Sequence, residues 1–164
     1  MTWEDDVAAA WADAPNLEPE DLRARIDRIV SDPAVPEGVA HFERAGAYDS
    51  TGRPDLAVPG YQQALAAGLD ESRTRQATVQ LASSLRNLGR PGEGLELLET
   101  LDESCGDGLD RAVTVFRALC LTDLKRADEA VALLIETVAG NMTRYQRSAH
   151  AYAQALREAA TGDR

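Results

Sequence analysis

The chain has 164 residues, the length of one ordinary domain with a substantial core. Apolar residues make up 44% and charged residues 27%, as in folded water-soluble proteins. Aromatic residues are only 5%, while Ala and Leu are plentiful, which favours helices over sheets. The formal net charge of −11 would repel the phosphate backbone of a nucleic acid, so we do not expect nucleic-acid binding.

The first residues do not resemble a targeting signal. Met1-Thr-Trp-Glu-Asp-Asp6 is acidic where a signal peptide needs positive charge and then an apolar run, and no stretch reaches the roughly eighteen apolar residues of a membrane span. Cys105 and Cys120 have the spacing of neither a metal site nor a redox pair, and Cys120 lies in an apolar pattern typical of a small buried side chain. We expect a cytoplasmic protein without membrane contact.

The first 35 residues are predicted to form two helices. Thr2 and Asp5 have the spacing of a capping box, which predicts a short amphipathic helix over 3–13. A second helix is expected between Pro19 and Asp32, because its apolar residues recur on one face: Leu22, Ile26, Ile29 and Val30.

Three similar segments then recur at offsets of 37 and 36 residues. They begin with Gly52-Arg53-Pro54-Asp55, Gly89-Arg90-Pro91-Gly92 and Lys125-Arg126-Ala127-Asp128. The glycine can adopt the left-handed conformation that ends one helix, and the proline suits the first turn of the next. Lys125 replaces the glycine in the third segment, so this turn is predicted to be strained or to close differently.

The segments predict three helical hairpins, over about 37–69, 71–105 and 108–139. The expected helix pairs are 37–51 with 54–67, 71–88 with 91–103, and 108–124 with 126–139. Small residues recur where the paired helices would approach closely, so we expect these to be buried: Ala57, Ala82, Ala118 and Ala130.

A last helix is expected over about 142–160, capped by Asn141. It would cap the open end of the stack with one apolar side, made of Met142, Tyr145, Ala149, Tyr152 and Leu156. The predicted organisation is an N-terminal helical extension, 1–35, followed by the three repeats and the capping helix in 36–164.

The repeat resembles the tetratricopeptide repeat (TPR), whose helix-turn-helix unit carries small, Gly or Ala, and aromatic or Leu positions at this spacing. Stretches such as Tyr61-Gln-Gln-Ala-Leu-Ala-Ala-Gly-Leu69 and Leu81-Ala-Ser-Ser-Leu-Arg-Asn-Leu-Gly89 are similar to a short bacterial type with three repeats. The resemblance covers roughly residues 36–139, although Arg44 and Arg117 stand where the family prefers Leu. It implies an all-α fold, a right-handed α-solenoid of stacked helical hairpins whose first helices line a concave groove.

The resemblance also implies which first-helix side chains face the groove. In this sequence the candidates are Phe42, Asp49, Ser50, Gln80, Ser83, Arg86, Asn87, Phe116, Leu119, Thr122 and Asp123. Some family members clamp a C-terminal carboxylate with Lys, Asn and Arg, but those positions hold Phe42, Gly46, Gln80, Ala112 and Phe116 here, so no such clamp is expected. The alternative is that some apolar members of the set pack against the N-terminal helices.

Signals of catalysis are poor. His41 and His150 are the only histidines, and neither has an acid or a cysteine at the spacing of a metal site or a nucleophile–base pair. We therefore expect no catalytic residues, no metal and no cofactor.

The sequence predicts a protein–protein interaction module, a scaffold that binds a protein or peptide in the concave groove. The alternative is a structural protein that uses the same surface to form a homodimer, so monomer and homodimer both stay open. An enzyme is expected less than either, and the identity of the partner does not follow from the sequence.

Overall fold

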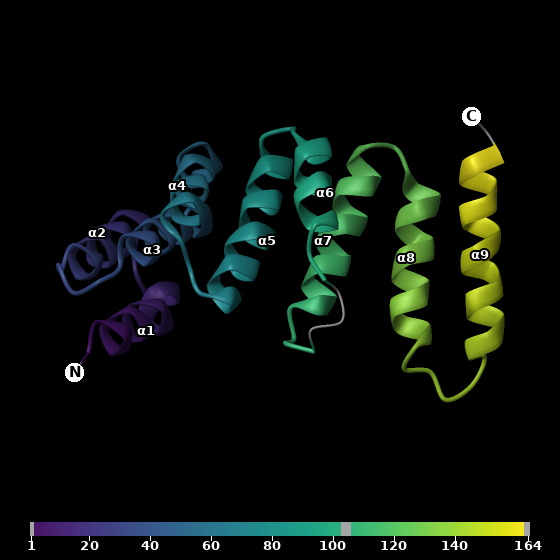
Figure 1. Ribbon diagram of the computed structural model, residues 1–164, viewed down its shortest axis with the longest axis horizontal. Helices are drawn as coiled ribbons and strands as arrows, with labels where there is room; N and C mark the ends of the chain where they lie inside the picture. The colour runs from purple at the N-terminus through teal and green to yellow at the C-terminus, as the bar shows by residue number, and fades with distance from the viewer. Residues whose placement is uncertain (1, 103–105, 163–164) are drawn as a thin grey trace. The chain divides into compact units, whose positions relative to one another are not determined.

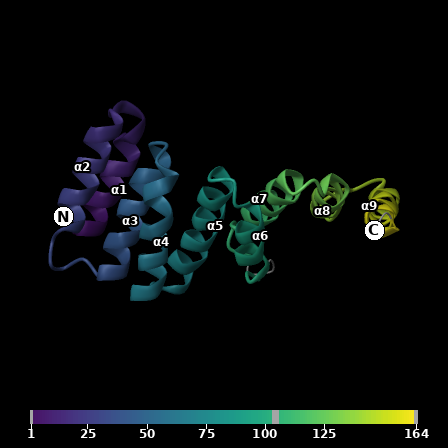
Figure 2. The same ribbon diagram turned by 90° about the horizontal axis from the view of Figure 1, so that it is seen from above.

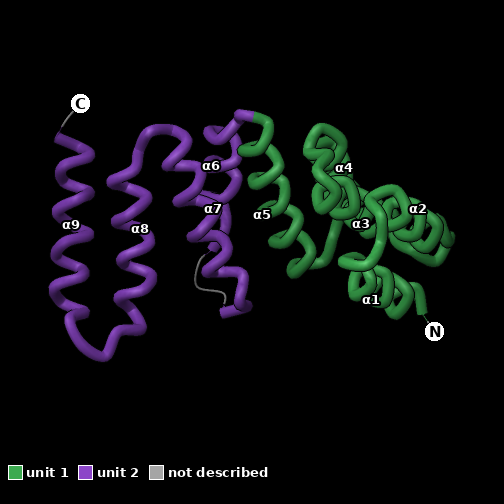
Figure 3. Tube along the Cα trace, turned by 180° about the vertical axis from the view of Figure 1, so that it is seen from behind, with its two compact units in different colours: residues 1–88 green, residues 89–164 purple. Residues whose placement is uncertain are grey.

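The computed structural model describes residues 2–102 and 106–162, and over these residues it consists of helices, turns and loops without strands (Figure 1). The chain forms two compact units, residues 1–88 (unit 1) and 89–164 (unit 2), coloured separately in Figure 3. None of the described helices is both long and apolar enough to cross a membrane. The all-α prediction is confirmed.

Unit 1 is a succession of helices in which each α-helix packs against the next α-helix. They are α1 (Trp3–Asp13), the short 3-10 helix η1 (Ala14–Asn16), α2 (Pro19–Val30), α3 (Glu37–Ser50), α4 (Pro54–Ala67) and α5 (Glu71–Asn87). Figures 1 and 2 show α3 between the α1–α2 pair and α4.

Unit 2 continues the pattern with four helices that also pack in chain order. They are α6 (Pro91–Glu99), α7 (Asp110–Asp123), α8 (Ala127–Ala139) and α9 (Gln146–Gly162). In Figure 1, α7, α8 and α9 lie side by side.

The N-terminal helices form as predicted and pack onto α3. The Asp5 backbone N–H donates to Thr2 Oγ1 at 3.3 Å, and the Thr2 backbone N–H donates to the Asp5 carboxylate at 2.8 Å, which completes the capping box. The apolar faces of the first three helices share one core, made of Val7, Ala10, Leu22, Ile26, Val30, Val35, Val39, Ala40 and Ala47. This core fixes α1 beside the first predicted repeat.

The three turns that were predicted from the repeat share one backbone conformation. Gly52, Gly89 and Lys125 have φ of 75°, 76° and 64°, so a lysine occupies the left-handed region that the two glycines adopt without strain. In the first and third turns the next backbone N–H reaches back to the helix, from Arg53 to Tyr48 O at 2.9 Å and from Arg126 to Leu121 O at 2.8 Å. Of the two outcomes expected for the third turn, the structure shows the strained one, because the turn closes as the first does but with a lysine at positive φ.

The small residues of the repeat are buried as expected: Ala57, Ala82, Ala118 and Ala130. Glycine serves the same purpose between α3 and α4, because a Cβ at Gly60 would lie 2.9 Å from the Ala45 Cβ. Close approach of the helices therefore depends on these small side chains.

The prediction for the last helix is wrong at its start, and its apolar side is only partly buried. The helix α9 begins at Gln146, because Tyr145 has a φ of 63° and interrupts helical geometry, and Asn141 lies in the turn after α8, where its N–H donates to Val138 O. Tyr145 and Tyr152 are 76% and 70% exposed, whereas Ala153 is fully buried. The two tyrosines of the predicted apolar side are thus exposed, whereas its other members, Met142, Ala149 and Leu156, are half-buried.

One other boundary differs by more than two residues. The helix α6 ends at Glu99 rather than near 103, and the Thr100 hydroxyl donates to Leu97 O at 2.7 Å just after that end. Cys120 is buried, as predicted, and Cys105 lies outside the described residues.

Candidate functional site

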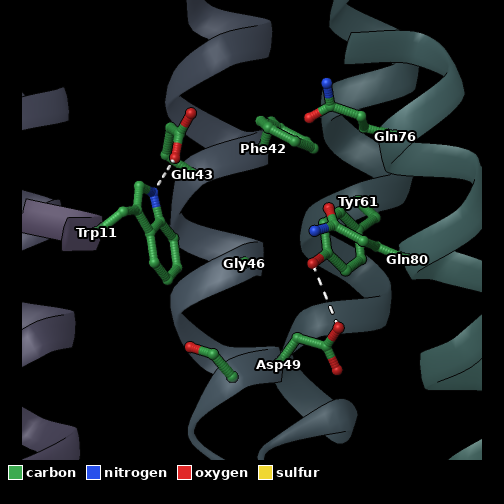
Figure 4. Close-up of a pocket in the computed structure, with 9 residues that line it drawn as sticks. Trp11, Phe42, Glu43, Gly46, Asp49, Tyr61, Gln76 and Gln80 are labelled. Carbon is green, nitrogen blue, oxygen red and sulfur yellow. Dashed lines mark hydrogen bonds between the residues drawn. The ribbon is translucent and has the colours of Figure 1, made fainter. Parts of the chain in front are cut away.

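A cavity of about 390 Å³ lies within unit 1, between α1, α3, α4 and α5 (Figure 4). Its lining residues come from four helices: Trp11, Phe42, Glu43, Gly46, Asp49, Ser50, Tyr61, Gln76 and Gln80. A space of this size can hold a side chain of a bound segment.

Helix geometry explains why α3 contributes most of the lining. Phe42, Gly46 and Asp49 are spaced by four and three residues and therefore lie on one face of the helix. Gly46, at the centre of this face, leaves room for the Trp11 ring, since a Cβ there would lie 3.3 Å from that ring. Figure 4 shows Trp11 on one side of Gly46 and Gln76 and Gln80 on the other.

Glu43 holds α1 to α3. Trp11 Nε1 donates a hydrogen bond of 2.7 Å to Glu43 Oε2, and the glutamate is only 7% exposed. Burial raises the pKa of the Glu43 carboxyl above its usual value, while the Trp11 hydrogen bond and the charge of Arg73 act in the opposite direction.

Asp49 is a second carboxylate of the cavity. It accepts a hydrogen bond of 2.9 Å from the Ser84 hydroxyl and a long one of 3.4 Å from the Tyr61 hydroxyl. Burial raises the pKa of Asp49, and these two hydrogen bonds partly offset the rise. Burial, and then the nearby Asp49 charge, raise the pKa of Tyr61, so its phenol stays protonated as a donor.

Aromatic rings and an amide complete the lining. The Phe42 and Tyr61 rings are tilted by 53° with centroids 6.2 Å apart. Gln80 Oε1 is buried and accepts no hydrogen bond from any residue in the described part of the chain. The cavity therefore combines aromatic surface with carboxylate and amide oxygens, a set suited to a ligand that donates hydrogen bonds.

The structure brings together some of the groove residues predicted from the sequence and separates others. Phe42, Asp49, Ser50 and Gln80 line the cavity. The rest are on helices of both units but do not line this cavity: Ser83, Arg86 and Asn87 on α5, and Phe116, Leu119, Thr122 and Asp123 on α7.

Four of the lining residues lie outside the set predicted from the sequence: Trp11, Glu43, Tyr61 and Gln76. Trp11 comes from the N-terminal extension, outside the repeat pattern, and lies against Gly46. This contact places the N-terminal extension against the α3 face that lines the cavity. A signal for Glu43 was available, since it precedes Gly46 by three residues and Ser50 by seven and therefore shares their helix face.

A protein-family model described as "Tetratrico peptide repeat" matches residues 38–156, well over half of the chain. Neither the curated proteins nor the solved structures contain a significant match. The matched range begins at the start of α3 and includes every cavity residue except Trp11.

Proposed function

Because the chain belongs to the tetratricopeptide repeat family, we propose that it is an interaction module that binds a protein or peptide segment, with the unit 1 cavity as part of the binding surface. Such repeats present the first helices of their hairpins to partners, and proteins of this kind generally act as scaffolds without catalysing reactions. The match from residue 38 also supports the proposal that 1–35 is an extension to the repeats.

One observation carries this proposal. Four of the residues that the family resemblance assigns to the groove line the same cavity: Phe42, Asp49, Ser50 and Gln80. A cavity at this face, rather than a filled surface, is what binding of a partner side chain needs.

The test is capture of a partner by the immobilised full chain, with a variant that fills the cavity. Gln76→Trp places an indole at a half-buried lining position, while Gln63→Trp makes the same change at an exposed position of α4 outside the cavity. We expect the wild type and Gln63→Trp to capture the same protein from a lysate of the source organism and Gln76→Trp to lose it. Equal capture by both variants would contradict the proposal that the cavity is part of the binding surface. No capture by the wild type would contradict the interaction function itself.

The alternative function, a homodimer formed through the same surface, predicts a different result. Light scattering would then show a dimer for the wild type and a monomer for Gln76→Trp. A wild-type monomer over a wide concentration range would exclude this alternative.

A further inference from the structure

We propose that the unit 1 cavity binds a cationic side chain, arginine or lysine, of the partner segment. This inference rests on the proposed function, because it names the ligand chemistry of the same site.

The charge of the cavity has one sign. Glu43 and Asp49 both line it, and the described lining residues include no lysine or arginine. The hydrogen bonds recorded for the two carboxylates come from neutral donors, on Trp11, Ser84 and Tyr61. A cation in the cavity would be attracted by both carboxylates, and a carboxylate of a partner would be repelled.

Acids at the hairpin turns are arranged differently. At each turn one acid forms an ion pair with a nearby arginine, as in the exposed pairs of Arg53 with Asp55 and Arg90 with Glu93. The cavity carboxylates lack a directly bonded arginine of this kind among the described residues, although Arg73 is close enough to act on Glu43 through its charge. Their negative charge therefore remains available to a ligand.

The aromatic side chains of the cavity favour the same ligand. Of the three rings in the lining, Tyr61 is fully buried and Phe42 is only 8% exposed. The half-buried Trp11 indole, which the hydrogen bond to Glu43 holds in place, therefore presents most of the accessible ring surface (Figure 4). The faces of aromatic rings attract cations, and a planar guanidinium can also stack on them.

The buried amide oxygen of Gln80 supplies an independent reason. This atom lies out of contact with solvent and accepts no hydrogen bond within the described residues. A buried acceptor without a donor is unfavourable, and a guanidinium or ammonium group, which carries only donors, satisfies it once the Gln80 amide turns its oxygen into the cavity. Arginine, with five N–H donors, fits this set of oxygens best, and lysine is the second choice.

The test uses short uncharged host peptides, acetyl-Gly-Ser-Ala-Xaa-Ala-Ser-Gly-amide, in which Xaa is arginine, lysine, citrulline, norleucine or glutamate. Binding to the full chain is followed through the indole N–H resonance of Trp11, which is distinguished from that of Trp3 with the Trp3→Phe variant. We expect the arginine peptide to shift the Trp11 resonance and to bind at least about tenfold more tightly than the citrulline peptide, which has nearly the same shape without the charge. Equal or tighter binding of the citrulline, norleucine or glutamate peptide would overturn the proposal.

A pair of variants separates a local carboxylate from the overall negative charge of the chain. Asp49→Asn is expected to weaken binding of the arginine peptide at least about tenfold, whereas Glu71→Gln, the same charge change at an exposed position of α5, should stay within about twofold. Equal weakening by both variants would overturn the proposal. Circular dichroism checks that Asp49→Asn folds, and if it does not, Glu43→Gln takes its place with the same expectation.

The two proposals fail in different ways. A partner that is captured by the wild type and lost by Gln76→Trp, together with no binding of the arginine peptide, would overturn the cationic ligand and leave the interaction function standing. Binding of the arginine peptide without capture of any protein would contradict the interaction function alone.

Discussion

Replacing Trp11 by phenylalanine should destabilise unit 1, because it removes the donor on which the buried Glu43 depends. The bond measures 2.7 Å and Glu43 is 7% exposed, so water replaces the lost donor poorly. A hydrogen bond to a charged group contributes about 1.5–3 kcal/mol. We expect the free energy of unfolding at neutral pH to fall by about 2 kcal/mol for this reason.

The loss should depend on pH. Burial already raises the pKa of Glu43 from its ordinary 4.5, and the Trp11 hydrogen bond opposes that rise, so the pKa climbs further in the variant. The folded state then keeps a proton that the unfolded chain has released, and stability falls as the pH rises from the ordinary pKa through the raised one. The cost of Trp11→Phe should therefore be small near pH 4 and clearly larger near pH 7.

Urea titrations followed by far-UV circular dichroism at both pH values would measure this effect. The series consists of the wild type, Trp11→Phe, Glu43→Gln and the double variant, so that the cycle isolates the pair from the change in ring packing. We expect Trp11→Phe to cost about 1 kcal/mol less in the Glu43→Gln background. The same loss at both pH values and in both backgrounds would refute the role assigned to this hydrogen bond.

Three substitutions test the packing of the repeats by urea titration. Gly38→Ala should lower the free energy of unfolding by about 1–3 kcal/mol, because its Cβ would overlap the carbonyl oxygen of Gly68. The control is Gly92→Ala, also at the second residue of a helix but with open space around it, which should raise the free energy of unfolding by less than about 1 kcal/mol. Equal effects of the two substitutions would contradict the close approach of Gly38 to Gly68. Lys125→Gly should raise stability by about 0.5–1 kcal/mol by relieving the positive φ, and a loss would show that the lysine side chain matters more. Ala82→Leu should cost about 1–3 kcal/mol, and an unchanged midpoint would contradict the buried position of this residue in α5.

Local chemistry explains why most helix boundaries were predictable. Gly52 and Lys125 adopt the same left-handed backbone conformation, and a helix begins shortly after each of them. The periodic pattern therefore located both turns although the two residues differ. Similarly, the Thr2–Asp5 capping box depends on residues three positions apart.

The errors arose where packing between helices decides the outcome. On α9 the large apolar residues suggested that Tyr152 faces inward, but the buried residue is Ala153, because a small side chain allows closer approach to α8. The pairing of Trp11 with Glu43 joins residues 32 positions apart in two different helices, and no local pattern indicates such a contact. The repeat pattern identified the α3 side of the cavity, and only the fold revealed the α1 side.

The charged carboxylates of Glu43 and Asp49 are unfavourable where they lie, and helical hairpins can pack without them. Burial raises the pKa of both carboxyls, so at neutral pH each charge lowers the stability of unit 1, whereas apolar side chains could pack there without desolvating a charge. Groups that cost stability tend to occur at functional sites, where a ligand compensates them. Loss of charge at Asp49 should therefore weaken binding of a cation while leaving stability at neutral pH unchanged or higher. A purely structural carboxylate would show the reverse, with lower stability and unaltered binding.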